Sequence, residues 1–502
     1  MTAQSLPKNL YSAAQVRAMD HSAINEHGIP GAQLMKRAGR VCFEALLQQF
    51  PNPQALTVFC GGGNNGGDGY VIAALAQQAN IPVRVVYLVS PDTLTGDAQR
   101  AFAYAQQEGV VCEAWHTDLS LNEGIVVDAL LGTGLSGAVR GDYVEVINRI
   151  NDAGLPVLAV DIPSGLHADT GAVLGAAVCA SLTCTFIGLK AGLVTGEGPS
   201  VVGDLIYHDL EVPAQVLGAA ATAERLCLED LLAQLPERRQ SAHKGSFGHA
   251  LIIGGDVGYG GAAIMASQAC ARMGAGLTSL ATQPDNTVAC NVSQPEIMAA
   301  PIRTGVEVNP LLDKATVVAV GPGLGVQPWA EQLFFMAVQS QKTLVIDADA
   351  LNLLAKNLGR EILIQDRTRT RVLTPHPGEA GRLLNCTSGE IQADRFNAAK
   401  QLAEKYQAIV VLKGSGTVIA TPSGELFVCD LGNPGMASGG MGDVLTGMIA
   451  GLLVQNIEPL LAVKLAVCLH GQAADDMAIN FGQRGLLATD LIDQARALLN
   501  GF

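Results

Sequence analysis

The feature of this sequence that most restricts its fold is a repeated alternation of short apolar runs, glycine-rich loops and helical segments. In the first half the apolar runs are ALTVFC, VRVVYLV, IVVDAL and PVLAVD, and segments with helical character separate them. Strands that alternate with helices form a parallel sheet that helices cover on both faces. A content of 49% hydrophobic and 15% charged residues suits such buried strands. The sequence therefore predicts an α/β fold with three layers.

The same alternation starts again in the second half of the chain. Its apolar runs include HALIIGG, LTSLAT, TVVAVG, TLVIDADAL, RVLTP and AIVVL, and its loop sequences differ from those of the first half. A chain of 502 residues also exceeds what one hydrophobic core usually organises. An alanine-rich and then charged segment, residues 212–239, separates the two halves. We therefore predict two three-layer domains, residues 1–220 with a Rossmann-like parallel sheet and residues 221–502.

Local patterns also predict where helices begin. Apolar or small residues at helical spacing predict a helix over residues 12–26, in which Ser12 and Gln15 form a capping box. The segment GGGNNGGDG, residues 61–69, predicts a loop, and the alanine-rich segment after it predicts a helix over residues 70–80. The glycines of this loop allow positive φ angles and close backbone approach, and the loop leads from a strand into a helix, a geometry that receives a phosphate; the alternative is a tight turn with polar caps.

Charge and cysteine content limit the classes of function. The formal net charge of -15 argues against a general affinity for nucleic acid or anionic membranes, since both require a basic face. The 11 cysteines show no C-x-x-C pair, so we expect neither a disulfide framework nor a zinc site. The N-terminus lacks an apolar signal core, and residues 171–189 predict buried strands and not a membrane span. These patterns predict a cytoplasmic protein, and domains of this kind commonly form homo-oligomers.

Three polar or glycine-rich loops of the first half each follow an apolar strand. They are residues 64–68, 132–138 and 161–165, and they are expected at one edge of the sheet, where ligands of parallel sheets bind. Asp128 and Asp161 end two of the strands and are expected to point into the ligand crevice. Asn65, Asp128 and Ser164 offer oxygen atoms with little countercharge, which suits a monovalent cation, although Asp128 could instead only cap a loop.

The ordered motifs YSAAQVRAMD, GGGNNGGDG, VDALLGTG and VDIPSGL resemble the NAD(P)HX epimerase family, the N-terminal half of YjeF-type proteins, over about residues 10–210. The resemblance implies exchange of the R and S hydrates at C6 of the nicotinamide ring. It assigns a potassium ion to Asn65, Asp128 and Ser164, and the reacting ring to Asp161 as the catalytic residue. We expect the residues that bind the hydrated nucleotide to be Asn64, Asn65, Gly66, Gly67, Asp68, Gly132, Thr133, Gly134, Leu135, Ser136, Gly137, Ala138 and Asp161.

The strongest signal of the second half is NPGMASGGMGDVLTG, residues 433–447. Its glycines precede an apolar helix, so that free N–H groups converge on an anion. Asp443 at the helix start can accept a proton from a hydroxyl group. The alternative, an N-capped helix with Asp443 as the cap, requires no run of glycines.

Three motifs of this half resemble those of ribokinase-like enzymes. GGMGD resembles their G-x-G-D signature, and KGSGT, residues 413–417, resembles their adenine-nucleotide loop. HPGE, residues 376–379, stands where relatives carry an acidic motif that organises magnesium. His376 departs from the common Asn of sugar kinases, which argues against a sugar kinase; it could equally be a turn histidine beside Pro377.

The full set of motifs, which adds HKGSFGHALIIGG, GYGGA, GPGLG and DADAL, resembles the NAD(P)H-hydrate dehydratase family over about residues 225–500. The resemblance implies that ADP, or alternatively ATP, phosphorylates the C6 hydroxyl group in the presence of magnesium, after which phosphate leaves. It places the hydrated nucleotide at Ala262, Gly323, Gly325, His376 and the catalytic Asp443. It places the adenine nucleotide at Lys413, Gly414, Ser415, Gly416, Thr417 and Gly442.

Two other functions compete with this interpretation. A kinase of a small vitamin-precursor alcohol would explain GGMGD and KGSGT, but it would leave the first domain and His376 unexplained. The first domain could also be a binding module, although acidic residues at its strand ends argue against this. We therefore predict a bifunctional enzyme that acts on hydrated NADH and NADPH, with no nucleic acid or membrane partner.

Overall fold

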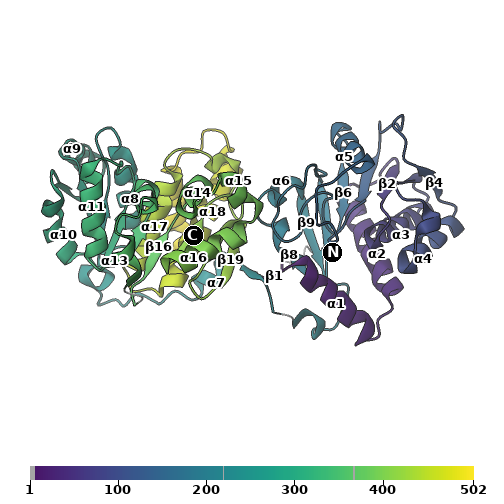
Figure 1. Ribbon diagram of the computed structural model, residues 1–502, viewed down its shortest axis with the longest axis horizontal. Coiled ribbons are helices and arrows are strands. Elements are labelled where there is room, and N and C mark those ends of the chain that lie inside the picture. Colours follow the sequence, from purple (N-terminus) through teal and green to yellow (C-terminus); the bar gives the residue numbers. More distant parts are fainter. Residues whose placement is uncertain (1–5, 219, 366–367, 502) are drawn as a thin grey trace. The chain divides into compact units, whose positions relative to one another are not determined.

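The structure is a computed structural model that describes residues 6–218, 220–365 and 368–501. The chain separates into two compact units, Met1–Glu224 and Arg225–Phe502, each an α/β structure (Figure 1). The predicted α/β fold class is confirmed.

The core of the first unit is a sheet of seven parallel strands in the order β4-β3-β2-β5-β6-β7-β9. The strands are β2 (Leu56–Cys60), β3 (Val83–Tyr87), β4 (Val111–Ala114), β5 (Ile125–Ala129), β6 (Val157–Val160), β7 (Leu182–Phe186) and β9 (Asp204–His208). The order reverses between β2 and β5, which makes the point between them the expected ligand crevice of a Rossmann-like sheet. Three short strands, β1 (Asn9–Tyr11), β8 (Leu189–Lys190) and β10 (Ala223–Arg225), are not part of this seven-stranded sheet, and β1 pairs with both others.

Helices cover both faces of this sheet because successive strand residues point to opposite sides. Val58 and Cys60 belong to the core on one face, and Phe59 belongs to the core on the other. The first face is covered by α2 (Gly31–Gln49), α3 (Asn64–Gln78) and α4 (Gly96–Gln107), which lie side by side in Figure 1, and the second by α5 (Asp142–Asp152). The remaining helices are α1 (Ala13–Asn25) and the short α6 (Gly198–Val201).

The helix starts show one correct and one wrong prediction. Helix α1 begins after Ser12, and Ser12 and Gln15 form the predicted capping box. The prediction of a loop over residues 61–69 was wrong, because α3 begins at Asn64. The glycines are needed there for close packing: a Cβ atom at Gly66 would collide with the carbonyl group of Gly61, and one at Gly69 would lie 2.7 Å from Ala129 Cβ. Tertiary packing thus overrides the low helix propensity of glycine.

The strand order of the sheet in the second unit also reverses once, but this sheet ends in antiparallel strands at one edge. Parallel strands run in the order β13-β12-β11-β14-β15-β16-β17, and the antiparallel strands β18 and β19 follow. Their bounds are β11 (His249–Ile253), β12 (Leu277–Thr282), β13 (Met298–Pro301), β14 (Val317–Val320), β15 (Thr343–Ile346), β16 (Arg371–Leu373), β17 (Ile409–Leu412), β18 (Thr417–Ala420) and β19 (Leu426–Cys429). The reversal lies between β11 and β14.

Helices cover this sheet on both faces as well. One layer contains α8 (Gly260–Arg272), α17 (Met441–Leu453), α18 (Pro459–Phe481) and α19 (Asp490–Leu499), which share the main core. The other contains α11 (Pro328–Gln339), α12 (Ala348–Ala355), α14 (Pro377–Leu384) and α16 (Arg395–Tyr406). Shorter helices are α7 (Leu228–Leu232), α9 (Pro284–Ser293), α10 (Asn309–Lys314), α13 (Arg360–Gln365) and α15 (Ser388–Ala393). The segment DADAL, expected to continue a strand, belongs to α12 from Ala348 onward.

Two global expectations concern the whole chain. The 11 cysteines are all free thiols, as the absence of a disulfide pattern predicts. Within the described ranges, every helix is too short or too polar to cross a lipid bilayer.

Candidate active sites

The first unit contains a cavity of about 980 Å³ at the predicted crevice. It is lined by the start of α3, the loop after β5, the end of β6 and one face of α1. The predicted nucleotide-binding residues found in its lining are Asn64, Asn65, Asp68, Gly132, Thr133, Gly134, Leu135, Ser136, Gly137, Ala138 and Asp161. Gly66 and Gly67 are buried in the first turn of α3 and do not line the cavity. The structure therefore brings the start of α3, the loop after β5 and Asp161, which are distant in sequence, to one cavity.

Asp161 is held in an unusual conformation at this wall. Its φ angle is 65°, a left-handed conformation that residues other than glycine seldom adopt. Its Oδ1 atom accepts hydrogen bonds from the Phe186 amide and the Thr185 hydroxyl group, both at 3.3 Å, and forms an ion pair with Lys190. No hydrogen bond from the described residues reaches its Oδ2 atom. The carboxylate is therefore fixed through one oxygen while the other stays available to a ligand.

Lys190 is almost completely buried, with 1% of its side chain exposed. Its ammonium group also donates to the Thr185 hydroxyl at 3.1 Å and to the Phe186 carbonyl at 3.0 Å. A buried ammonium ion requires a partner of opposite charge, and Asp161 is that partner. The pair places a charged carboxylate in the cavity wall.

Two further acids, Asp20 and Asp68, line the same cavity. Burial raises the pKa of Asp20 to about 6; the charge of Lys190 lowers it and that of Asp161 raises it. Burial and the charges of Asp161 and Asp20 raise the pKa of Asp68 well above its usual range. The cavity thus combines one ion-paired carboxylate with two acids whose pKa values are raised.

Of the three residues predicted to bind potassium, Asn65 lines this cavity, whereas Asp128, which was expected to point into the crevice, and Ser164 are buried and do not line it. Asp128 is fully buried and accepts hydrogen bonds from the Ser164 hydroxyl at 2.6 Å and the Ser164 amide at 2.8 Å. Burial raises the pKa of Asp128 to about 6, while these hydrogen bonds lower it. The Asn65 side chain has a buried Nδ2 atom without a hydrogen-bond partner in the described part of the chain. Asp128 and Ser164 are therefore in direct contact, and Asn65 has an unsatisfied amide.

In the second unit, the loops after β11 and β14 meet at the point where the strand order reverses. The Asp256 amide donates to the Gly323 carbonyl at 2.7 Å. A Cβ atom at Gly323, whose φ angle is 58°, would lie 3.1 Å from Ala262 Cβ. The Gly325 amide donates to Asp349 at 2.9 Å. The predicted residues Ala262, Gly323 and Gly325 therefore lie close together, and Asp349 is hydrogen-bonded to Gly325; these four residues are called the floor of the candidate site.

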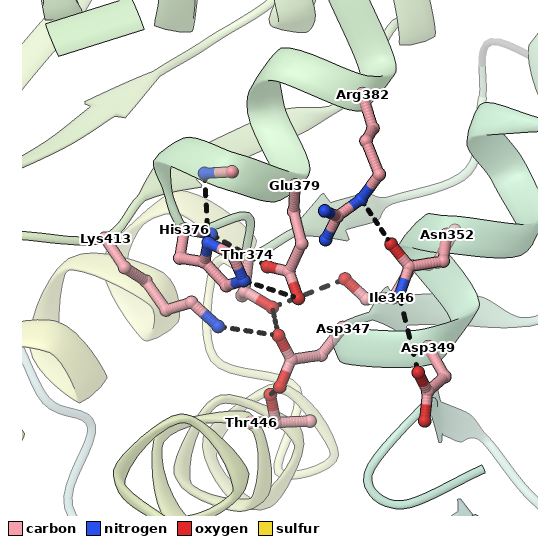
Figure 2. Close-up of polar contacts among 11 residues, drawn as sticks. Ile346, Asp347, Asp349, Asn352, Thr374, His376, Glu379, Arg382, Lys413 and Thr446 are labelled. Carbon is pink, nitrogen blue, oxygen red and sulfur yellow. Dashed lines mark hydrogen bonds and ion pairs between the residues drawn. The ribbon is translucent and has the colours of Figure 1, made fainter. Parts of the chain in front are cut away.

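Asp347 is the centre of a buried polar network beside this floor (Figure 2). Its Oδ1 atom accepts from Lys413 Nζ at 2.8 Å and from the Thr374 hydroxyl at 2.8 Å, and its Oδ2 atom accepts from the Thr446 hydroxyl at 2.7 Å. Only 1% of the Asp347 side chain is exposed. Asp347 follows β15, Thr374 follows β16 and Lys413 follows β17, so the network joins three strand ends to α17.

Helix α17 presents Asp443 to this network. Gly440 is the N-cap, with a φ angle of 94°, and Asp443 stands in the first turn, so Asp443 is not the cap. Burial and the charge of Asp347 raise the pKa of Asp443 to about 7, whereas Lys413 lowers it. A Cβ atom at Gly442 would lie 3.1 Å from Lys413 Nζ. Glycine at this position therefore lets the ammonium group approach the helix N-terminus, where an anion would bind.

His376 and Glu379 occupy the start of α14. His376 is the N-cap: its Nδ1 atom accepts from the Gly378 amide at 3.0 Å, and its own amide donates to Glu379 at 2.8 Å. The structural alternative for His376 is thus realised, yet 52% of its side chain is exposed and its Nε2 atom remains open except for Glu379 Oε1 at 3.4 Å. Burial raises the pKa of Glu379 to about 7. Capping leaves one ring nitrogen for a ligand.

The predicted nucleotide loop, Lys413–Thr417, joins β17 to β18. The buried Arg395 supports it from beneath, since its guanidinium donates to the Leu412 carbonyl at 3.1 Å and to the Gly416 carbonyl at 3.4 Å. A Cβ atom at Gly414, whose φ angle is 138°, would lie 2.9 Å from Arg395. The loop therefore requires glycine at position 414, because any larger residue would collide with the Arg395 guanidinium.

A larger cavity of the second unit, about 1580 Å³, lies elsewhere. Residues of 232–247, 271–274, 452–457 and 493–501 line it, and none of the predicted dehydratase residues is among them. Size alone therefore does not identify the site; the meeting of strand ends, glycines and acids does.

Sequence reasoning did not single out Lys190, Asp347 or Arg395. The sequence does offer a signal for Asp347, because this carboxylate ends an apolar strand pattern just as Asp128 and Asp161 do. Lys190 and Arg395 carry no such signal, because the sequence does not distinguish a buried basic residue from an exposed one. Their burial is understood only once their partners, distant in sequence, are known.

These features define a class of protein: a Rossmann-like unit with an acidic crevice joined to a unit with the glycine-rich helix start of ribokinase-like enzymes. Residues 31–192 match the family described as YjeF-related protein N-terminus, and residues 250–496 match the family described as NAD(P)H-hydrate dehydratase.

Similar proteins specify the family further. A bifunctional NAD(P)H-hydrate repair enzyme from Coxiella burnetii is 44% identical over 98% of this chain and 99% of its own length. One from Escherichia coli is 40% identical over 99% of this chain and 95% of its own length. The chain belongs to the family of bifunctional NAD(P)H-hydrate repair enzymes.

A solved structure agrees with the fold of the second unit. The ADP/ATP-dependent NAD(P)H-hydrate dehydratase from Bacillus subtilis, crystallised with ATP and Mg²⁺, is 32% identical, with a TM-score of 0.50; the match covers 55% of this chain and 96% of that chain. The predicted ribokinase-like fold and the predicted family are both confirmed.

Proposed function

We propose that this chain repairs hydrated NADH and NADPH, the first unit by exchanging the R and S hydrates and the second by dehydrating the S hydrate with consumption of an adenine nucleotide. The observation that carries this proposal is the start of α17, where open helix N–H groups, the Lys413 ammonium and Asp443 come together. Such a site can bind a phosphate and accept a hydroxyl proton. Membership of the repair family supports the same conclusion.

The overall reaction is tested by mixing the purified chain with hydrated NADH and ADP and following the return of NADH absorbance. The S hydrate alone tests the second unit, and the R hydrate tests both units together. Failure to regenerate NADH from either hydrate would contradict the proposal.

In the second unit, Asp443 would accept the proton of the C6 hydroxyl while that oxygen attacks the terminal phosphorus of the nucleotide. The C6–O bond then breaks with loss of phosphate as the lone pair of the ring nitrogen forms a C=N bond. Loss of a proton from C5 completes the dihydropyridine. Lys413 would balance the charge of the phosphates, because its Nζ atom lies where a Gly442 Cβ would approach within 3.1 Å.

We propose ADP as the donor, with ATP as the alternative, and magnesium bound with it. The described residues include no group of three or more His, Cys, Asp or Glu side chains arranged to hold a metal. Magnesium nevertheless fits, because it commonly takes one or two carboxylates and completes its shell with phosphates and water. Glu379, at the start of α14, would be such a carboxylate here, and the ion would supply positive charge to the transferred phosphate. Soaking crystals with ADP and magnesium tests this placement.

In the first unit, we propose that the Asp161 carboxylate faces C6 of the hydrated ring. Replacing Asp161 by Asn is expected to slow epimerisation roughly 10²-fold, since it removes a group that transfers a proton. The measurement is chromatographic separation of the R and S hydrates over time. Asp118→Asn, a matched change at an exposed loop residue, serves as the control. Epimerisation by Asp161→Asn at the wild-type rate would contradict the assignment.

The potassium ion is proposed to bind at Asn65, Asp128 and Ser164. The residues fit this ion: one carboxylate and neutral oxygens suit a single positive charge, and rotating the unsatisfied Asn65 amide would offer its oxygen. When bound, the ion would neutralise Asp128 and hold the loops that line the cavity.

Potassium is therefore expected to stabilise the first unit as well as support its activity. At a free concentration about ten times Kd, binding would add about 1.4 kcal/mol to the free energy of unfolding. Thermal melts in potassium and in tetramethylammonium chloride measure this difference, which Asp128→Asn should abolish. Equal melting temperatures in both salts would contradict the site.

Cytoplasmic location and a homo-oligomeric state remain predictions.

A further inference from the structure

Epimerisation requires a proton donor as well as a proton acceptor, and Asp161 is engaged as an acceptor. The nitrogen of the hydrated ring leaves C6 poorly unless it is protonated, because it would otherwise depart as an anion. Asp161 is ion-paired with the buried Lys190 and accepts hydrogen bonds through Oδ1, so it is placed to accept a proton and not to donate one. The donor must therefore be another group of the same cavity.

Helix α1 contributes one face to the cavity, through Val16, Arg17, Asp20 and Ile24. Asp20 is the acid on this face, and its carboxyl group forms no hydrogen bond with the described residues. The Arg17 guanidinium donates to the Thr133 carbonyl at 2.9 Å, which ties α1 to the glycine-rich loop after β5. The Ala13 amide donates to Asp169 at 2.6 Å and fixes the start of the helix. Asp20 is thus an acid without a hydrogen-bond partner among the described residues. Its helix is fixed at the N-terminus by Asp169 and bonded to the loop after β5 through Arg17.

We propose that Asp20 is the catalytic proton donor of epimerisation, acting with the Asp161 carboxylate. This inference rests on the proposed epimerase function. The Asp161 carboxylate accepts the proton of the C6 hydroxyl, the oxygen forms a C=O bond, and the C6–N1 bond breaks. Asp20 gives its proton to N1, which yields an open-chain aldehyde. Rotation about the C5–C6 bond exposes the other face, and closure returns both protons to their donors, so the reaction is balanced without a co-reactant.

The charges around Asp20 agree with this role. Its carboxyl group lines the same cavity as Lys190, Asp161 and Asp68 and interacts electrostatically with all three, and Arg17 lies on the same helix. Burial raises the pKa of Asp20 to about 6, which leaves a protonated fraction near neutral pH. The pKa of Asp68 is raised well above its usual range, so Asp68 would release a proton less readily. Asp20 is therefore the better matched of the two acids.

The test compares Asp20→Asn, Asp20→Glu and Asp68→Asn in the full chain. For the wild type, kcat/KM for epimerisation should fall as the pH rises above about 6, because the protonated form of Asp20 is required. Asp20→Asn should lower kcat about 10²-fold with little change in KM and should remove this pH dependence. Asp20→Glu should restore part of the rate and of the pH dependence.

Three results would overturn the inference: wild-type kcat in Asp20→Asn, an effect on KM alone, or loss of the pH dependence in Asp68→Asn but not in Asp20→Asn. ADP-driven dehydration of the S hydrate by each variant reports whether the second unit is folded, and an unchanged KM for epimerisation reports the same for the first unit, which contains Asp20. Failure of the proposed function is distinguishable, because the wild-type chain would then not exchange the two hydrates at any pH.

Discussion

The variant Asp443→Asn is expected to dehydrate the S hydrate about 10³-fold more slowly than the wild type, because it lacks the base that accepts the hydroxyl proton. Asparagine keeps the size of the side chain and preserves the first turn of α17. The pKa of Asp443 is raised to about 7 by burial and by Asp347, so the wild-type rate should rise as the pH increases through about 7. This rise in rate with pH should be absent in Asp443→Asn. NADH absorbance measured under saturating ADP provides the rate.

The matched control is Asp313→Asn, which changes an exposed aspartate of α10 in the same unit. It should retain the wild-type rate and pH profile. Epimerisation by Asp443→Asn should also remain unchanged, because Asp443 belongs to the other unit. A variant that dehydrates at the wild-type rate would remove Asp443 from the mechanism.

The second large effect is expected from Lys413→Met. Asp347 is 1% exposed and Lys413 is its charged partner at 2.8 Å. Removing one member of a buried ion pair leaves an uncompensated charge, which costs about 3–5 kcal/mol of unfolding free energy. Burial lowers the pKa of Lys413, but the charges of Asp347, Glu379 and Asp443 outweigh this and raise it, so the wild-type ammonium stays charged. Dehydration should be lost together with stability.

Urea denaturation of the full chain measures the stability change, with Lys400→Met on the exposed side of α16 as the control. Adding Asp347→Asn to Lys413→Met should recover part of the lost stability, because the buried charge is then removed. It should not recover dehydration, which requires the cation beside the phosphates. If Lys413→Met were as stable as the control, the network would not hold the unit together.

The sequence alone predicts the layers of both units and the position of the crevices. Strand and loop patterns are local, so ALTVFC, IVVDAL and PVLAVD identify buried strands, and the loops after them gather at one edge. For the same reason, the strand pattern was sufficient to select Asp128 and Asp161. The start of α3 could not be predicted in this way, since Asn64–Gly69 is helical only because Gly66 and Gly69 pack against distant backbone and side chains.

What only the tertiary structure decides is which charges meet. Lys190 follows Asp161 by 29 residues and Thr446 follows Asp347 by 99, and neither pairing has a sequence pattern. Burial of a charge depends on its surroundings in three dimensions, whereas hydrophobic periodicity depends on neighbours along the chain. The sequence thus determines the sheets, the edges at which their loops gather and the positions of the glycines in those loops. Folding determines that Asp161 is ion-paired and that burial raises the pKa values of Asp20 and Asp443.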